Sequence, residues 1–150
     1  MDNYEKIAEG VVVNRIRSSW IELFKLYNDQ AAEKGVSLSM AFVLLTINEK
    51  FGTPVTKIAP RMSMEPNSLS RILKAMEKKG AIYKRKDKSD KRKVYICLTE
   101  YGIELRDLAA QRLFSFEKAI HEKVNKNDII AFFRVMDTIP NVVDSLKKNK

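Results

Sequence analysis

The sequence predicts a mainly α-helical chain with one small β-hairpin, in the order α-α-α-α-β-β-α-α. Apolar residues recur every three or four positions towards both ends of the chain. Between residues 82 and 98 the apolar period changes to two, in two short runs separated by the polar stretch DKSDKR. The length of 150 residues, 45% of them hydrophobic, fits a single domain with one core.

Two helices are expected before residue 52. The first runs from residue 7 to about Glu33, on an apolar stripe of Ile7, Val11, Val13, Ile16, Trp20, Leu23, Phe24 and Tyr27. Gly35 is a helix-stop signal, and Ser37 can then cap a second helix that ends before Phe51. The apolar residues of this second helix include Phe42, Leu44, Leu45 and Ile47.

The next stretch predicts a short helix, a turn and a longer helix. Residues 53–55 form an extended connection, and Thr56 caps a brief helix over residues 57–62. Pro60 shortens that helix, because it lacks the first N–H that would be donated within it. The stretch of residues 65–80 predicts the longer helix. The weak cap Glu65 is at its start, Pro66 is in its first turn, and Gly80 is the residue after its last one. Its apolar stripe is Leu69, Ile72, Leu73 and Met76.

The C-terminal part predicts two strands followed by two helices. The strands are residues 82–86 and 93–98, with Val94, Ile96 and Leu98 facing the core. Thr99 caps a fifth helix that continues to about Val124, where the stretch NKND interrupts it. The sixth helix follows and is expected to bend or break at Pro140.

The positive charge is concentrated in one fifth of the chain. The formal net charge is +9, and residues 61–93 hold twelve Lys/Arg against four Asp/Glu, a net of +8. A basic segment within an otherwise neutral chain is typical of a surface that binds a polyanion, although a solvated lysine-rich surface has the same composition. The shape of the segment decides between them.

The basic segment has the form of a winged helix-turn-helix. A short helix, a turn and a second helix come first, and a hairpin with a charged tip follows; in such units the second helix enters the major groove of DNA. On the helical wheel, the face of this helix opposite its apolar stripe offers hydrogen-bond donors and cations. The candidate DNA-binding residues there are Asn67, Ser68, Ser70, Arg71 and Lys74, and those of the wing are Lys88, Asp90, Lys91 and Arg92.

The stretches SLSMAFVLLTI, PNSLSRILKAMEKKGAI and DKSDKRKVYICLTEYG resemble the MarR (multiple antibiotic resistance regulator) family of bacterial transcription factors. The family's Asp-x-Arg wing motif matches Asp90-Lys91-Arg92, and its Leu-Thr-x-x-Gly motif matches residues 98–102. The resemblance implies that Arg92 enters the minor groove and that Asp90 holds its guanidinium, which suits a bidentate pair. Pro60, Glu65 and Pro140 depart from the family pattern.

The resemblance also implies an assembly and an effector. It divides residues 1–150 into a DNA-binding lobe at about 37–98 and dimerisation helices at about 4–33 and 99–147. The amphipathic helices at both ends present more apolar surface than so small a lobe covers, which favours a homodimer. The family often binds small anionic or aromatic effectors in a cleft, and Arg17, Trp20 and Phe24 are candidate lining residues, with packing in the core or dimer as the default role of the aromatic residues.

Several classes of protein fit poorly. One cysteine, Cys97, permits no internal disulfide, and one histidine, His121, leaves no zinc ligand cluster, so no metal and no cofactor is expected. Cys97 is expected to be an inert small residue and His121 a surface residue. No apolar run is long enough to span a bilayer and no signal peptide is recognisable, which favours a soluble cytoplasmic protein associated with the nucleoid.

The preferred function is a sequence-specific regulator of transcription that binds double-stranded DNA, a ligand-responsive repressor acting as a homodimer on a palindromic operator. An enzyme is not expected, because the chain has no glycine-rich phosphate loop and no recognisable nucleophile motif. The alternative is a winged-helix module that binds RNA or a protein partner instead of an operator. A palindromic duplex site separates the two.

Overall fold

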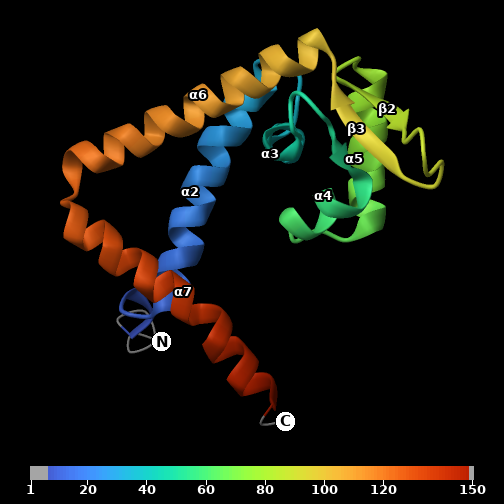
Figure 1. Cartoon of the computed structure of the whole chain (residues 1–150). Helices are drawn as coiled ribbons and strands as arrows, with labels where there is room; N and C mark the ends of the chain where they lie inside the picture. Colours follow the sequence, from blue (N-terminus) through green and yellow to red (C-terminus); the bar gives the residue numbers. More distant parts are fainter. Residues whose placement is uncertain (1–6, 149–150) are drawn as a thin grey trace. The chain divides into compact units, whose positions relative to one another are not determined.

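The computed structural model describes residues 7–148 and confirms a mainly helical winged-helix fold with a small sheet (Figure 1). The elements are α2 (Val12–Ala32), α3 (Leu38–Thr46), β1 (Thr53–Pro54), α4 (Val55–Arg61), α5 (Pro66–Lys78), β2 (Ile82–Lys86), β3 (Val94–Leu98), α6 (Glu100–Lys123) and α7 (Lys126–Lys148). They form two compact units, Met1–Ala110 and Gln111–Lys150, with the division inside α6. Within residues 7–148, no helix has both the length and the apolar character needed to cross a membrane.

The first long helix begins later than its apolar stripe predicts. The backbone turns at Gly10, and Val11 is extended, with φ −86° and ψ 127°, so α2 begins at Val12. Val11 and Val13 are exposed and give the helix no packing there. The periodicity of Ile7 and Val11 therefore does not belong to one continuous helix.

The second helix is capped as expected. Ser37 is extended, and its Oγ accepts a hydrogen bond from the N–H of Met40 at 3.2 Å. This contact satisfies one of the donors that a helix start leaves unpaired. The helix α3 then buries Leu38, Val43 and Leu44 and ends at Thr46.

The sheet has three strands, one more than predicted. Its order is β1-β3-β2, with both pairs antiparallel. Thr53 pairs with Ile96 and Pro54 with Tyr95, so the short extended connection is an edge strand. Thr53 is buried, and its Oγ1 accepts a hydrogen bond from the N–H of Asn48 at 2.9 Å. A two-residue strand is too short to have a period, so no local pattern indicates this pairing.

Thr56 does not cap the short helix. The residue at the cap position is Pro54, and α4 runs from Val55 to Arg61, so Thr56 lies in its first turn. Pro60 lies inside the helix and is not the first residue whose N–H would be donated within it. The hydrogen bond that the helix lacks is the one to the carbonyl of Thr56. The helix ends one residue later, and Ser63 in the following turn has the left-handed φ of 48°.

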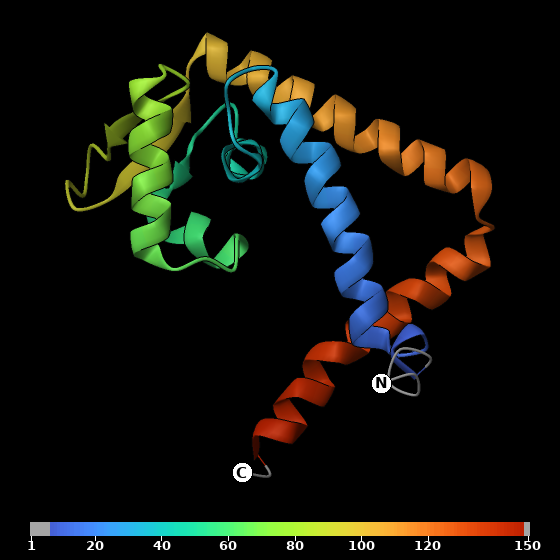
Figure 2. The same cartoon turned by 180° about the vertical axis from the view of Figure 1, so that it is seen from behind.

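The long helix of the motif, α5, matches its prediction at both ends. Pro66 is its first residue, Glu65 makes no side-chain cap, and Gly80 follows the end with φ +73°. Leu69, Leu73 and Met76 are buried. Figures 1 and 2 show α5 lying along the sheet. The apolar stripe of α5 contacts the sheet, α3 and α4.

The Leu-Thr-x-x-Gly motif is a joint between the sheet and α6. The Thr99 Oγ1 donates to the Gly80 carbonyl at 2.6 Å and accepts from the N–H of Gly102 at 3.0 Å. A Cβ on Gly102 would lie 1.9 Å from the carbonyl oxygen of Ala81. The glycine is therefore required by the close approach of α6 to residue 81.

The last helix is not broken at Pro140. α7 is continuous from Lys126 to Lys148 with Pro140 inside it, so of the expected bend or break the break does not occur. A proline removes one N–H, and the turns on both sides can retain their own hydrogen bonds. The helix begins where Asn125 caps it, because its Oδ1 accepts from the N–H of Asp128 at 3.0 Å.

Candidate nucleic-acid interface

The polar face of α5 is exposed, as the helical wheel predicts. The exposed side chains on it are Asn67, Ser68, Ser70, Arg71 and Lys74, while the residues of the opposite stripe pack into the core. Asn67 and Ser68 lie in the first turn of the helix, where backbone N–H groups have no partner within the helix. Donors and cations at a helix N-terminus are suited to phosphates and base edges.

The wing tip is organised by Asp87, which the sequence motifs did not single out. Its Oδ1 accepts three hydrogen bonds, from the Ser89 hydroxyl at 2.6 Å, from the Ser89 N–H at 2.8 Å and from the Asp90 N–H at 2.9 Å. The hydroxyl bond and the two backbone bonds lower the pKa of Asp87 to about 2. The Asp-x-Ser spacing typical of an Asx turn was the signal present in the sequence.

Asp90 holds Arg92 through one carboxylate oxygen. The Asp90 Oδ1 accepts from the backbone N–H of Arg92 at 3.1 Å and from its Nε at 3.2 Å. This is not the bidentate fork expected from the motif, since the two residues are only two apart and the carboxylate reaches the backbone and Nε instead. The Arg92 side chain is 93% exposed, so the restraint acts on a guanidinium that is open to a ligand.

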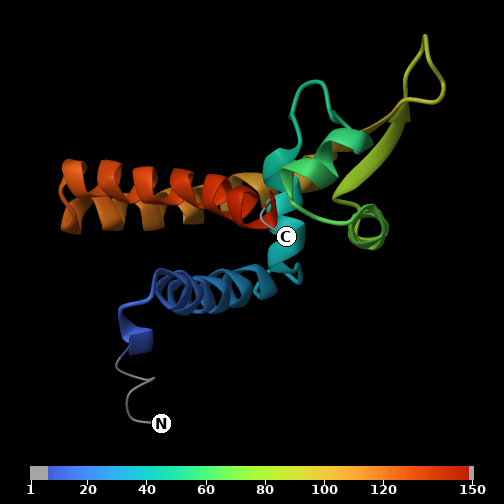
Figure 3. The same ribbon diagram turned by 90° about the horizontal axis from the view of Figure 1, so that it is seen from below.

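The wing projects from the rest of its unit and is lined by lysines. Figure 3 shows the tip of the β2–β3 hairpin extending beyond the neighbouring helices α4 and α5. Lys88 and Lys91 are exposed at this tip. The backbone N–H of Asp87 donates to the carbonyl of Lys93 at 2.9 Å, which closes the hairpin below them.

Besides Arg92, three cations of the basic segment make contacts within the protein. Arg61 Nη1 donates to the Thr46 carbonyl at 3.2 Å. Lys84 Nζ lies 3.2 Å from Glu77 Oε2, which joins β2 to α5. Arg85 Nη2 donates to the Phe51 carbonyl at 2.7 Å, and its Nε donates to the Cys97 Sγ at 3.5 Å. The bond to the Cys97 thiol raises the pKa of Arg85. The +8 of the segment is therefore not all available to a polyanion.

Comparison with known proteins identifies the helix-turn-helix region. Residues 36–94, which include α3, β1, α4, α5 and β2, match the model described as the MarR family. Over these residues the chain matches the MarR family. The matched region contains the helix-turn-helix and most of the wing, so the Asp90–Arg92 motif lies within it and the Leu-Thr-x-x-Gly motif follows shortly after it.

The MarR-family relatives include the HTH-type transcriptional regulator SarZ of Staphylococcus epidermidis. It is 28% identical over 87 residues, which are 58% of this chain and 59% of SarZ, so the match spans about three fifths of that relative. The DNA complex of S. aureus MepR superposes with a TM-score of 0.79 at 16% identity, covering 88% of this chain and 98% of MepR.

A second structural neighbour is CouR from Rhodococcus jostii. Its complex with p-coumaroyl-CoA superposes with a TM-score of 0.75 at 18% identity and covers 88% of this chain and 93% of CouR. CouR has also been solved with a 23-mer DNA duplex, with a TM-score of 0.74. At these identities the superpositions establish the shared fold.

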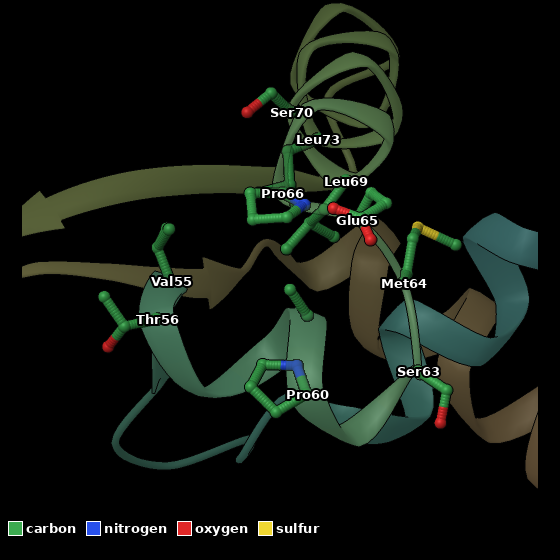
Figure 4. Close-up of a pocket in the computed structure, with 11 residues that line it drawn as sticks. Val55, Thr56, Pro60, Ser63, Met64, Glu65, Pro66, Leu69, Ser70 and Leu73 are labelled. Atoms are coloured by element: carbon green, nitrogen blue, oxygen red, sulfur yellow. The ribbon is translucent and has the colours of Figure 1, made fainter. Parts of the chain in front are cut away.

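The MarR-type lobe also has a pocket between α4 and α5, with a volume of about 520 Å³ (Figure 4). Apolar lining includes Val55, Ala59, Leu69 and Leu73, and the polar lining residues are Thr56, Ser63, Glu65 and Ser70. The candidate effector residues Arg17, Trp20 and Phe24 do not belong to this pocket.

The candidate effector residues lie together on α2. Trp20 and Phe24 have ring centroids 6.3 Å apart, and Trp20 stacks on Phe42 of α3 at 6.5 Å. Trp20 and Phe24 are nevertheless 47% and 46% exposed, and Arg17 is also exposed. The role of the three residues as an effector site stays a prediction.

Cys97 and His121 belong neither to the polar face of α5 nor to the wing tip. Cys97 is buried on the face of β3 that is turned away from Ile96 and Leu98, beside Gly52. His121 is exposed on α6, with its Nε2 3.7 Å from the carboxylate of Glu117. Among residues 7–148, no three His, Cys, Asp or Glu side chains lie close enough to hold a metal ion.

Proposed function

We propose that this chain is a transcriptional regulator that binds double-stranded DNA by sequence, with α5 in the major groove and the wing beside it. The observation on which the proposal rests is the Arg92 guanidinium, 93% exposed, restrained by Asp90 at 3.2 Å and placed at the tip of a basic hairpin. A restrained cation loses less conformational entropy on binding than a free one. The structures of MepR and CouR in complex with DNA support the proposal.

In this proposal the two parts of the lobe have different tasks. Asn67, Ser68, Ser70 and Arg71 on α5 contact base edges and nearby phosphates, while Lys74 and the wing lysines neutralise the backbone. Base contacts specify a sequence, and phosphate contacts set position and most of the salt dependence. Arg92 enters the minor groove, where narrow A·T-rich stretches attract a guanidinium.

We further propose that the regulator is a homodimeric repressor, cytoplasmic and associated with the nucleoid, that a small anionic or aromatic effector releases from a palindromic operator. Exposed apolar side chains on α2 and α7 support a second copy as partner. The p-coumaroyl-CoA complex of CouR supports an aromatic, anionic effector class. Arg17, Trp20 and Phe24 offer a cation and two aromatic rings to such a molecule.

The test is to recover the duplexes that the full chain binds from a randomised pool and from genomic DNA. We expect enrichment of one motif with two-fold symmetry, because two identical protomers address two identical half-sites. Single-stranded RNA of matched length is the competitor. Binding with no enriched duplex motif, or preference for the RNA, would overturn the proposal.

A further inference from the structure

Arg85 belongs to the basic segment by sequence, but its contacts lie within the protein. It lies on β2 directly opposite Tyr95 of β3. Its guanidinium carbon is 5.1 Å from the centre of the Tyr95 ring, its Nη2 donates to the Phe51 carbonyl at 2.7 Å, and its Nε donates to Cys97 Sγ at 3.5 Å. One face of the Arg85 guanidinium therefore lies against an aromatic ring, and two of its nitrogens donate hydrogen bonds within the protein.

The side chain of Arg85 reaches across the sheet. The strand order is β1-β3-β2, so a side chain from β2 that reaches Phe51 crosses the middle strand to the turn before β1. Phe51 is 34 residues from Arg85 in sequence. This contact connects the end of β2, next to the wing loop, to a distant segment of the same unit.

That segment, residues 48–52, is itself held in place. The Asn48 Oδ1 accepts from the Phe51 N–H at 2.8 Å, and the Asn48 carbonyl accepts from the Gly52 N–H at 2.9 Å. Arg106 of α6 lies 3.2 Å from Glu49 on the same turn. Gly52 has φ +71°, and a Cβ there would be 2.6 Å from Cys97 Sγ. The turn is thus an anchored point against which β3 is closely packed.

The tip of the wing extends beyond this point of attachment (Figure 3). A two-stranded hairpin is marginally stable by itself in water, and its direction depends on what holds its base. We propose that Arg85 is a positioning residue of the wing: it joins the hairpin to the turn at residues 48–52 and so sets the direction in which Arg92 meets DNA, rather than binding a phosphate itself. The inference deepens the proposed function and rests on it.

Replacement by lysine separates positioning from phosphate binding. A lysine keeps the charge, so a phosphate ligand would tolerate Arg85→Lys. An ammonium group cannot donate to Phe51 and Cys97 in the same fixed plane while stacking on Tyr95, so a positioning residue would not. Lys86→Ala is the matched control, because it removes an exposed cation one position along the same strand.

The experiment is a double-mutant cycle on affinity for the selected duplex, with Arg85→Lys and Arg92→Ala singly and together. We expect Arg85→Lys to weaken binding by about tenfold in the native chain and by less than about twofold when Arg92 is already alanine, because the effect acts through Arg92. Equal decreases in both backgrounds, or native affinity for Arg85→Lys, would overturn the proposal.

Amide hydrogen exchange on the free protein supplies a measurement without DNA. We expect Arg85→Lys and Tyr95→Leu to speed exchange at Asp87 and Lys93, whose N–H groups close the hairpin, and to leave the core amides unchanged. Acceleration throughout the core, or unchanged exchange in the wing, would contradict it. If the native chain selects no duplex, the proposed function fails while this measurement still decides the role of Arg85.

Discussion

At the scale of single residues, the wing pairs an exposed cation with a carboxylate that would, by charge alone, oppose DNA binding. Asp90 accepts two hydrogen bonds from Arg92, one from its backbone and one from Nε. An exposed ion pair of this kind adds little to folding stability. We therefore expect the Asp90–Arg92 pair to affect DNA binding rather than folding stability.

Arg92→Ala should weaken affinity for the operator by about 1–3 kcal/mol. Asp90→Ala should also weaken it, although it removes a negative charge, because Arg92 then has no restraint from the carboxylate. Fluorescence titration of one duplex with each variant measures both. Glu104→Ala, which removes an exposed carboxylate from α6, is the control for charge alone. Tighter binding by Asp90→Ala would contradict the restraining role.

The pH dependence of the wing tip follows from Asp87. Its pKa is lowered from the ordinary 3.8 to about 2, so the hydrogen-bonded turn favours the carboxylate. This contribution is present above pH 3.8 and is lost as the pH falls through about 2. We expect the NMR signals of the Asp87 carboxyl and of the Ser89 and Asp90 amides to titrate together near pH 2 and to be constant at neutral pH. A midpoint near 3.8 would show that the turn does not form.

At the scale of elements, three glycines differ in how well their positions would accept a side chain. Gly102 has a carbonyl oxygen 1.9 Å from the position of a Cβ, whereas Gly80 has open space but φ +73°, and Gly10 has neither restriction. The first is fixed by the approach of α6 to Ala81, and the second by the end of α5.

Gly102→Ala should therefore lower the free energy of unfolding by about 3 kcal/mol, as overpacking against backbone does. Gly80→Ala should cost about 1–2 kcal/mol for its left-handed conformation, and Gly10→Ala should change stability by less than about 0.5 kcal/mol. Urea unfolding followed by circular dichroism gives all three values. A larger loss of stability for Gly80→Ala than for Gly102→Ala would contradict the close approach of α6 to Ala81.

Variants of α5 and variants of the wing should respond differently to salt. Lys88→Ala and Lys91→Ala should weaken binding to operator and random duplex alike and reduce the salt slope by about one for each phosphate that the variant no longer neutralises. Asn67→Ala and Ser70→Ala should mainly lower the ratio of specific to random binding. Titrations of both duplexes at several salt concentrations separate these results. Full discrimination by the α5 variants would mean that another face enters the major groove.

At the scale of the whole molecule, the exposed apolar side chains are gathered on the long helices. On α7 the side chains of Phe132 and Phe133 are 56% and 53% exposed, and on α2 that of Trp20 is 47% exposed. Large aromatic groups left in water at this density favour burial against a partner. The proposed homodimer, built from α2, α6 and α7, would cover them.

Sedimentation equilibrium at micromolar concentration should give twice the 17.3 kDa of one chain. Phe132→Glu with Phe133→Glu should shift the mass to that of one chain and weaken DNA binding, because a single protomer addresses only one half-site. Arg134→Glu, the exposed neighbour on α7, is the control for added negative charge. A native mass of 17.3 kDa would exclude the dimer.

Elements whose signals are local could be predicted from the amino-acid sequence. Ser37, Pro66 and Thr99 mark helix starts through groups within three residues, and Gly80 marks a helix end through its own φ, so each is recognisable in a short window. The apolar stripe of α5 predicted its buried face, and therefore its exposed polar face. The charge of residues 61–93 and the Asp90–Arg92 spacing indicated the wing for the same reason.

Features that depend on residues far apart in the chain emerged only when the chain was folded. β1 is a strand because β3 lies beside it, Gly102 is needed because Ala81 approaches it, and Arg85 is engaged because Phe51, 34 residues away, offers a carbonyl. The continuity of α7 through Pro140 and the break before α2 likewise departed from the local signals. Local sequence patterns determine which helices and strands form. The contacts between those elements determine that Arg85 binds a carbonyl and that Arg92 remains exposed to a ligand.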